Sequence, residues 1–100
     1  MKYDKLVRDN IPDHIRSKGG APITHIADDA EYWQKLKEKL AEEVDEFRKD
    51  ETVEELADIL EVLDAIIEHN RFDKEKINTA KTKKLEERGG FKERIILEEA

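Results

Sequence analysis

The stretch from Leu40 to Ile67 constrains the fold most, because it contains two helical patterns with acidic residues on their apolar faces. It reads LAEEVDEFRKDETVEELADILEVLDAII. A polar connection around residues 49–52 separates the two patterns, and a connection this short favours helices that pack antiparallel. We therefore expect a long antiparallel helix pair to form the centre of the domain.

Each of these two helices carries a pair of acids three residues apart, Glu43 and Glu46 on the first and Glu55 and Asp58 on the second. Residues at i and i+3 share one helix face, so antiparallel packing can bring four carboxylates to one spot. Glu43 and Glu55 fall inside the apolar arcs of their helices, and Asp58 lies at the border of its arc. A buried carboxylate is costly unless it is paired or bound to a metal. The pattern indicates a divalent-cation site.

A simpler interpretation of these acids stays open. Charged residues make up 45% of the chain, so such spacings also arise on solvated helix faces, and lysines could neutralise the intruding acids. If the acids do hold a metal, a set of oxygen ligands suits Mg²⁺, with Mn²⁺ as a substitute, better than zinc or iron. The three histidines support this choice, since none follows a glutamate by three residues as in di-iron bundles.

Length and composition limit the classes of protein to consider. One hundred residues form one domain, which we place at residues 1–100, and the helical patterns predict the all-α class. A net charge of −7 argues against binding to a nucleic-acid polymer. There is no cysteine, no signal peptide and no apolar run near the roughly 18 residues of a membrane span. We expect a cytoplasmic protein that does not enter a membrane.

Capping residues predict where the helices begin and end. The expected order is a short opening segment, a short helix that ends at Gly19-Gly20, an irregular stretch, the central pair and a last helix that ends at Gly89-Gly90. The N-cap candidates are Asp9 or Asn10, Asp28 or Asp29, Glu51 or Thr52, and Asp73, and Asn70 suits the end of the second central helix. After the last helix we expect an extended tail that packs Phe91, Ile95 and Leu97 back onto the domain.

Two cations, Lys5 and Arg8, stand just before the first helix in the segment KLVRD. Helix N-termini attract anions through their free N–H groups and the helix dipole, so these cations could help to bind a phosphate. From spacing alone, a salt-bridged surface turn is the favoured interpretation of the segment.

Several segments together resemble a known family. Glu42-Glu43-x-x-Glu46 followed by Glu55-x-x-Asp58 is similar to the ExxE…ExxD signature of the MazG-like all-α nucleoside triphosphate pyrophosphohydrolases. The segments KLVRDNIP, YWQKLKEKLAEEVDEF, EELADILEVLDAI and KKLEERGGFKERIIL resemble the branch of that superfamily that removes noncanonical nucleotides. The interval between Glu46 and Glu55 is shorter than in many members, which makes the helix connection tight.

The resemblance implies a MazG-like helical bundle that hydrolyses a nucleoside triphosphate to the monophosphate and pyrophosphate. It makes Glu43, Glu46, Glu55 and Asp58 the Mg²⁺ ligands, with Glu43 and Glu46 also catalytic. We expect Glu46 to position the attacking water, because it lies at the edge of the apolar arc. Glu42 aligns with an extra acid that often precedes the first ligand, but it points away from the arc.

Further implications concern the substrate phosphates and the assembly. Lys5, Arg8, Lys84 and Arg88 are the expected phosphate-binding cations. The superfamily points to a homodimer or homotetramer, and two broad apolar arcs exceed what one chain can cover. The sequence also leaves two other functions open: phosphoribosyl-ATP pyrophosphohydrolase, and a non-enzymatic helical interaction module with an acidic face.

Overall fold

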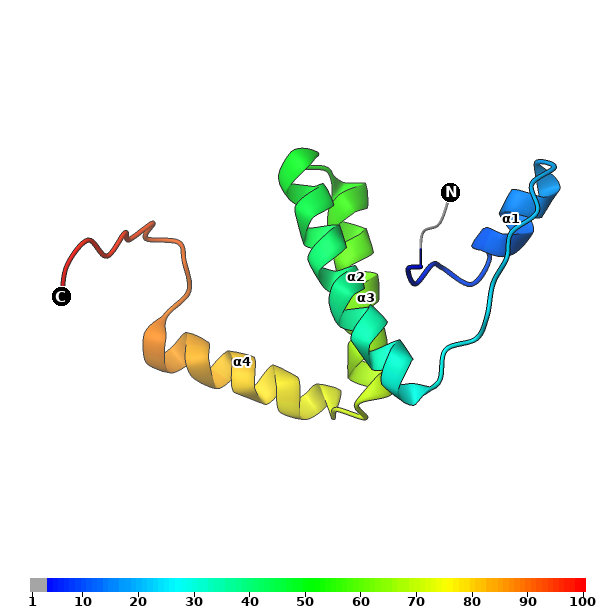
Figure 1. Cartoon of the computed structure of the whole chain (residues 1–100). Helices are drawn as coiled ribbons and strands as arrows, with labels where there is room; N and C mark the ends of the chain where they lie inside the picture. The colour runs from blue at the N-terminus through cyan, green and yellow to red at the C-terminus, as the bar shows by residue number, and fades with distance from the viewer. Residues whose placement is uncertain (1–3) are drawn as a thin grey trace.

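The computed structural model describes residues 4–100; the first three residues of the expected opening segment lie outside the described residues. The described part contains four α-helices and no strand, which confirms the all-α class. Figure 1 shows their order: α1 (Ile11–Ser17), α2 (Asp29–Lys49), α3 (Val53–His69) and α4 (Lys74–Arg88). Residues 21–28, which make up most of the expected irregular stretch, have no regular secondary structure.

Most of the predicted helix ends are confirmed. The side chains of Asp28, Thr52 and Asp73 accept hydrogen bonds from backbone N–H groups in the first turns of α2, α3 and α4. Helix α1 is the exception: Asn10 occupies the N-cap but its side chain makes no capping hydrogen bond. Asn70 ends α3 and Gly89 ends α4, so short polar residues and glycine set the helix lengths.

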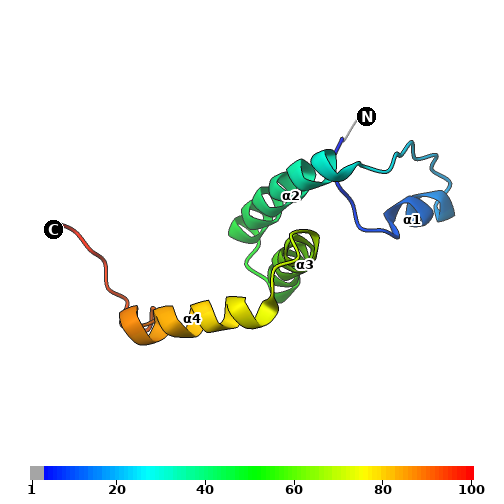
Figure 2. The ribbon, with the colours of Figure 1, turned by 90° about the horizontal axis from the view of Figure 1, so that it is seen from below.

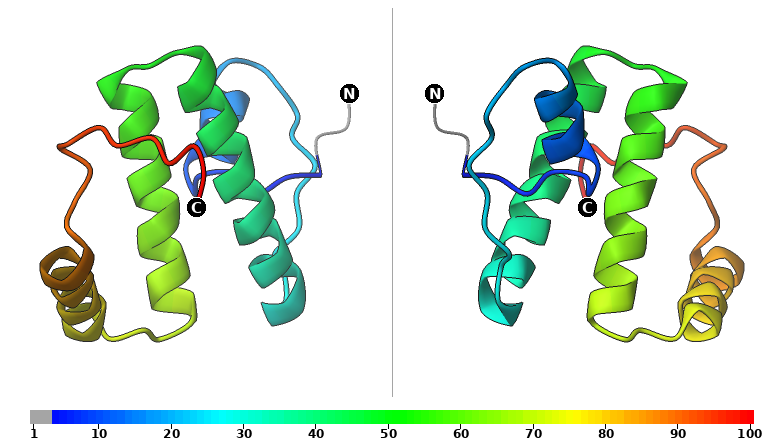
Figure 3. Two further views of the ribbon diagram at one scale, coloured as in Figure 1. Left: turned by 90° about the vertical axis from the view of Figure 1, so that its left-hand side faces the viewer. Right: turned by 90° about the vertical axis from the view of Figure 1, so that its right-hand side faces the viewer.

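Helices α2 and α3 form the packed centre of the molecule. The chain reverses through residues 50–52 and α3 runs back alongside α2, as Figures 1 and 3 show. At the other end of this hairpin the His69 ring stacks on Trp33 with centroids 5.7 Å apart and meets Tyr32 edge-on at 5.1 Å. These ring contacts hold the ends of the two helices together.

The interior of this hairpin is thin. Among the described residues, the buried apolar side chains are Leu36 on α2 and Val62 on α3, and the buried charged one is Glu43. A core of this size leaves large apolar side chains exposed on the same helices, and Leu56 and Leu60 of α3 are about half exposed. One chain therefore does not cover its own apolar surface.

Helix α4 and the segment after it point away from the hairpin (Figures 1 and 2). The exit is set by the turn after α3, where Arg71 has φ 54°, and the N–H of Phe72 donates to the carbonyl of Ile67 over 3.0 Å. This pattern of hydrogen bonds is a Schellman motif, which stops a helix and turns the chain. The molecule is consequently extended, with dimensions of 55 × 31 × 24 Å.

The expectation that the tail packs back onto the domain is wrong. Phe91, Ile95 and Leu97 are 97%, 81% and 78% exposed. The exit turn and α4 carry the tail away from the hairpin (Figure 1), so these side chains stay exposed in the described part of the chain.

Candidate metal centre

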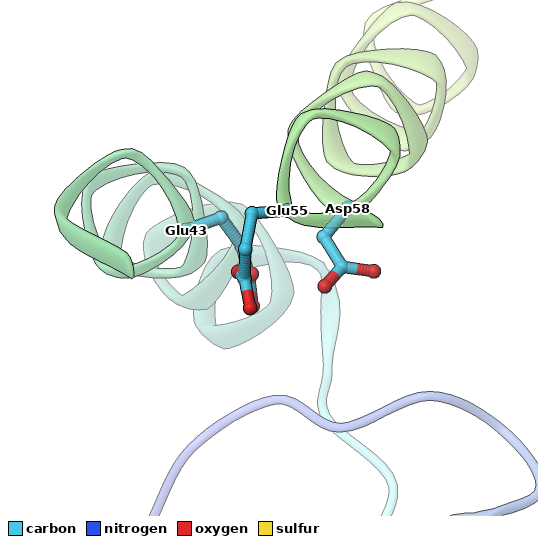
Figure 4. Close-up of side chains that lie close together, drawn as sticks. All are labelled: Glu43, Glu55 and Asp58. Carbon is cyan, nitrogen blue, oxygen red and sulfur yellow. The ribbon is translucent and has the colours of Figure 1, made fainter. Parts of the chain in front are cut away.

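Three carboxylates from two helices converge beside the connection between α2 and α3. An oxygen of Glu43, an oxygen of Glu55 and an oxygen of Asp58 all lie within 4.8 Å of one another. Figure 4 shows Glu43 reaching from α2 and the other two from α3 into the space between the helices. We call these three residues the acidic trio.

Local structure explains why the trio forms. Glu43 lies on the same face of α2 as Leu36 and is itself buried, which agrees with its place in the apolar arc. Thr52 caps α3 and accepts a hydrogen bond from the N–H of Glu55 at 3.2 Å, so the cap fixes the first turn from which Glu55 projects. Asp58 follows three residues later on the same face.

Two members of the trio have cationic partners. Lys39 Nζ lies 3.2 Å from Glu43 Oε1, and both side chains are largely buried. Arg8 Nη2 donates to Asp58 Oδ1 over 2.8 Å, with both groups partly exposed. The open alternative, that lysines neutralise the acids inside the apolar arcs, therefore applies to Glu43, whereas Asp58 at the border of its arc pairs with an arginine.

Glu55 has no such partner among residues 4–100. Desolvation raises the pKa of its carboxyl group, and the negative charges of Asp58, Glu46 and Glu43 raise it further. A group of carboxylates that repel one another in this way gains most from a cation placed between them. The oxygen donors fit a hard divalent ion such as Mg²⁺.

Glu46, the fourth expected ligand, is exposed and lies outside the trio. Its charge still acts on Glu55, as the raised pKa of that group records. The structure therefore brings together three of the four expected ligands and leaves Glu46 at the edge.

The segment before α1 lies beside this site and supplies both of its expected cations. Arg8 contacts the trio directly through Asp58, and Lys5 Nζ lies 3.1 Å from Glu42 Oε1. Partial burial would raise the pKa of Glu42, but the hydrogen bond from Lys5 and the charge of Lys39 outweigh it, so this pKa lies below its ordinary value. Glu42 is thus held ionised by cations, at a distance from the trio's shared space.

A pocket of about 250 Å³ opens next to Lys39, between the first described residues and α2. Its walls are Asp4, Lys5, Leu6, Lys35, Glu38, Lys39 and Glu42. Its three lysines are balanced by its three acids, and each lysine lies within 4.0 Å of an acid: Lys5 and Lys39 of Glu42, and Lys35 of Glu38. Lys39 connects the pocket to the trio, because the same ammonium group lies near both Glu42 and Glu43.

Lys84 and Arg88, the other expected phosphate-binding cations, are on α4, which leads away from the trio within one chain (Figure 1). In contrast, Lys39 was not expected and belongs to the site. Its signal in the sequence was the i,i+4 spacing to Glu43, which places an amine over the carboxylate on one helix face.

The fold and the site together define an all-α protein with an acidic trio flanked by cations. No family model matches the chain, and no solved structure matches it. The chain is similar to an uncharacterized protein of Mycolicibacterium smegmatis (strain ATCC 700084 / mc(2)155), with 48% identity over 48 residues. The match covers 48% of this chain and 49% of that protein, so the chain spans about half of this relative's length.

Proposed function

We propose that the protein is a Mg²⁺-dependent nucleoside triphosphate pyrophosphohydrolase of the MazG-like type, acting in the cytoplasm on noncanonical nucleotides. The single observation that supports this proposal most is the convergence of Glu43, Glu55 and Asp58 from two helices within 4.8 Å. The resemblance of the ExxE…ExxD pattern adds the reaction, which is hydrolysis between the α and β phosphates.

Glu43, Glu55 and Asp58 would hold the divalent ion, which would supply positive charge to offset that of the triphosphate and of the leaving pyrophosphate. The side chains around the trio have complementary tasks. Arg8 and Lys39 pair with trio carboxylates at 2.8 and 3.2 Å, and in this proposal the same two cations bind phosphate oxygens of the substrate. Lys5 lines the same pocket as Lys39.

In this proposal, Glu46 positions the attacking water. It is exposed, close enough to Glu55 to affect its pKa, and outside the trio. From there it can accept a proton from a water that attacks the α phosphorus in line with the departing pyrophosphate. The new P–O bond gives the nucleoside monophosphate, and the broken bond leaves pyrophosphate.

The proposal includes self-association as a homodimer or homotetramer. The accessible surface of the chain is 9478 Å², whereas a compact monomer of this mass exposes about 5900 Å². The radius of gyration of 17.9 Å also exceeds the roughly 13 Å of a compact chain of this length. Association with a second copy of the chain is the simplest way to bury the excess surface.

The test is pyrophosphate release by the full chain from a panel of canonical and damaged nucleoside triphosphates, with Mg²⁺, Mn²⁺ or a chelator. We expect release from at least one triphosphate only when a divalent ion is present. Glu55→Gln should lower kcat by about 100-fold or more, because it removes a metal ligand without changing the shape of the side chain. Glu54→Gln is the matched control, since Glu54 is exposed on the same helical turn and outside the trio.

One observation favours a non-enzymatic alternative. The cations on Glu43 and Asp58 can make the trio a structural ion-pair network, as in a helical interaction module. That module would show no turnover with any triphosphate and no divalent-ion binding. Phosphoribosyl-ATP belongs in the same panel, and turnover of that substrate alone would favour the histidine-pathway reaction instead.

A further inference from the structure

The segment 74–97, which comprises α4 and the tail after it, is an arm that lies apart from the hairpin of its own chain (Figure 2). Phe91, Ile95, Ile96 and Leu97 near its end are between 78% and 97% exposed. Large apolar side chains exposed together in this way mark an interaction surface.

Helix α3 offers an apolar stripe of matching character. Val53, Leu56, Leu60 and Leu63 alternate at spacings of three and four residues, so they line one face of the helix. Their exposed fractions are 80%, 46%, 56% and 37%. This stripe lies on the hairpin, and no described element of the same chain covers it.

The charges of the two helices are complementary. Helix α3 contains six acids and no lysine or arginine, whereas α4 contains six lysines and arginines and three acids. Opposite charges on surfaces that must meet steer association and fix the register.

The complementarity extends to single residues. Glu61, Asp64 and Glu68 form an exposed strip at i, i+3 and i+7 on α3, and none makes an ion pair among the described residues. Another exposed strip with the same spacing occurs on α4, and its members also have no ion-pair partner within residues 4–100. This basic strip consists of Lys81, Lys84 and Arg88. Each strip is about 10 Å long at 1.5 Å per residue.

We propose that the arm of each chain docks on α3 of a second copy, with α4 antiparallel to the partner's α3. This direction places the basic strip along the acidic strip with Arg88 opposite Glu61. Residues 91–97 then continue toward the beginning of α3, where Val53 and Leu56 are exposed. The alignment that pairs the charged strips therefore also brings the apolar side chains of residues 91–97 against the apolar stripe of the partner's α3.

The same alignment brings a partner's cations toward the acidic trio. Glu55 and Asp58 lie at the beginning of α3, and the tail that arrives there carries Lys92 and Arg94. The size is also adequate, because the arm has 24 residues and a stable interface uses about 20–30 residues on each side. This inference rests on the self-association proposed above and gives it a specific interface.

The decisive experiment mixes two charge-reversed variants of the full chain. One carries Lys81→Glu, Lys84→Glu and Arg88→Glu, and the other carries Glu61→Lys, Asp64→Lys and Glu68→Lys. Each variant alone should dimerise about 100-fold or more weakly than the natural chain, because like charges then face one another. Mixed in equal amounts, they should form a heterodimer, since both arm contacts are again between opposite charges. Sedimentation velocity measures all three states.

A second pair of variants tests the apolar contact. Phe91→Ser with Ile95→Ser should convert the dimer to a monomer. The matched control is Ile23→Ser with Ile26→Ser, which removes two equally exposed isoleucines, 101% and 95% exposed, from the loop before α2. The control should stay dimeric.

Three outcomes overturn the inference. If the charge-reversed variants remain dimeric, the arm is not the interface, although self-association stands. If both are monomeric and the mixture is too, the arm does not bind a second copy. A natural chain that is a monomer with a radius of gyration near 13 Å shows that α4 folds back on its own α3, and then the proposed self-association fails as well. The catalytic proposal is assayed separately with Glu55→Gln.

Discussion

Glu55 differs from the other two carboxylates of the trio because it has no cation beside it within residues 4–100. Lys39 offsets the charge of Glu43 and Arg8 that of Asp58, while the repulsion at Glu55 remains. Among the described residues, Glu55 is therefore the member of the trio whose charge no cation offsets. A buried or crowded acid that keeps its charge at a cost to stability is common at functional sites.

The raised pKa of Glu55 gives a prediction about stability and pH. The folded state binds the proton more tightly than the unfolded state, so the contribution of this group is most favourable at low pH and is lost as the pH rises from the ordinary glutamate value through the raised folded value. Glu55→Gln removes this loss. Without metal, the variant should melt at a higher temperature than the natural chain at pH 7, and the difference should shrink as the pH falls below about 4.5.

The measurement is a set of thermal melts between about pH 4 and pH 8 in a chelator. Glu42→Gln is a control of opposite sign, because its pKa is lowered by Lys5 and Lys39 and the charged form is the favoured one. That variant should lose stability at pH 7. A Glu55→Gln variant that melts below the natural chain at pH 7 would contradict the repulsion between Glu55 and its acidic neighbours.

At the scale of the helices, short polar residues at the ends carried most of the predictive information. Asp28, Thr52 and Asp73 can satisfy free N–H groups wherever a helix begins, and this local chemistry is legible in sequence. The convergence of Glu43 with Glu55 followed from helix periodicity and a short connection. The pairing of Arg8 with Asp58 did not, since it joins residues fifty positions apart and depends on the path of the irregular segments.

The caps of α2 and α3 provide a matched pair of variants. Asp28→Ala and Thr52→Ala each remove one hydrogen bond to a first-turn N–H group and should each cost about 1 kcal/mol in the free energy of unfolding. Only Thr52 holds the turn that presents Glu55. Thr52→Ala should therefore also weaken Mg²⁺ binding, measured by calorimetry, whereas Asp28→Ala should leave it unchanged. Equal weakening by both variants would show that the cap has no special link to the trio.

At the scale of the whole molecule, the sequence predicted too compact a protein. Phe91, Ile95 and Leu97 were expected to pack on the domain because apolar residues in a charged tail need a cover. A sequence pattern shows that a side chain needs burial but not whether its own chain or another provides it. The turn at Arg71, where a non-glycine residue adopts φ 54°, sets the direction of α4. No sequence pattern predicted this turn. None of the helices in the described part of the chain is long and apolar enough to cross a membrane.

A divalent ion should stabilise the whole molecule if the trio binds it. Binding to the folded state alone adds RT ln(1 + [L]/Kd) to the free energy of unfolding, which is about 2.7 kcal/mol at 100 times Kd. Addition of Mg²⁺ should raise the melting temperature of the natural chain by several degrees and should have little effect on Glu55→Gln. An equal rise in both proteins would place the ion elsewhere.

Because the interior is thin, the stability of the protein should depend on its concentration. With Leu36 and Val62 as the buried apolar residues of the described chain, one copy has little core, so a large part of the stability should come from contacts between copies. Dilution of the natural chain by about 100-fold should then lower its melting temperature by several degrees, since folding is coupled to association. The strips on α3 and α4 are charged and exposed, and in 1 M salt the Debye length is about 3 Å, so the salt screens their attraction. The melting temperature should then depend more strongly on protein concentration. Differential scanning calorimetry at several concentrations measures both effects. A melting temperature independent of concentration would mean that each chain completes its fold alone, and the exposed tail and stripe would then have to find each other within a single copy.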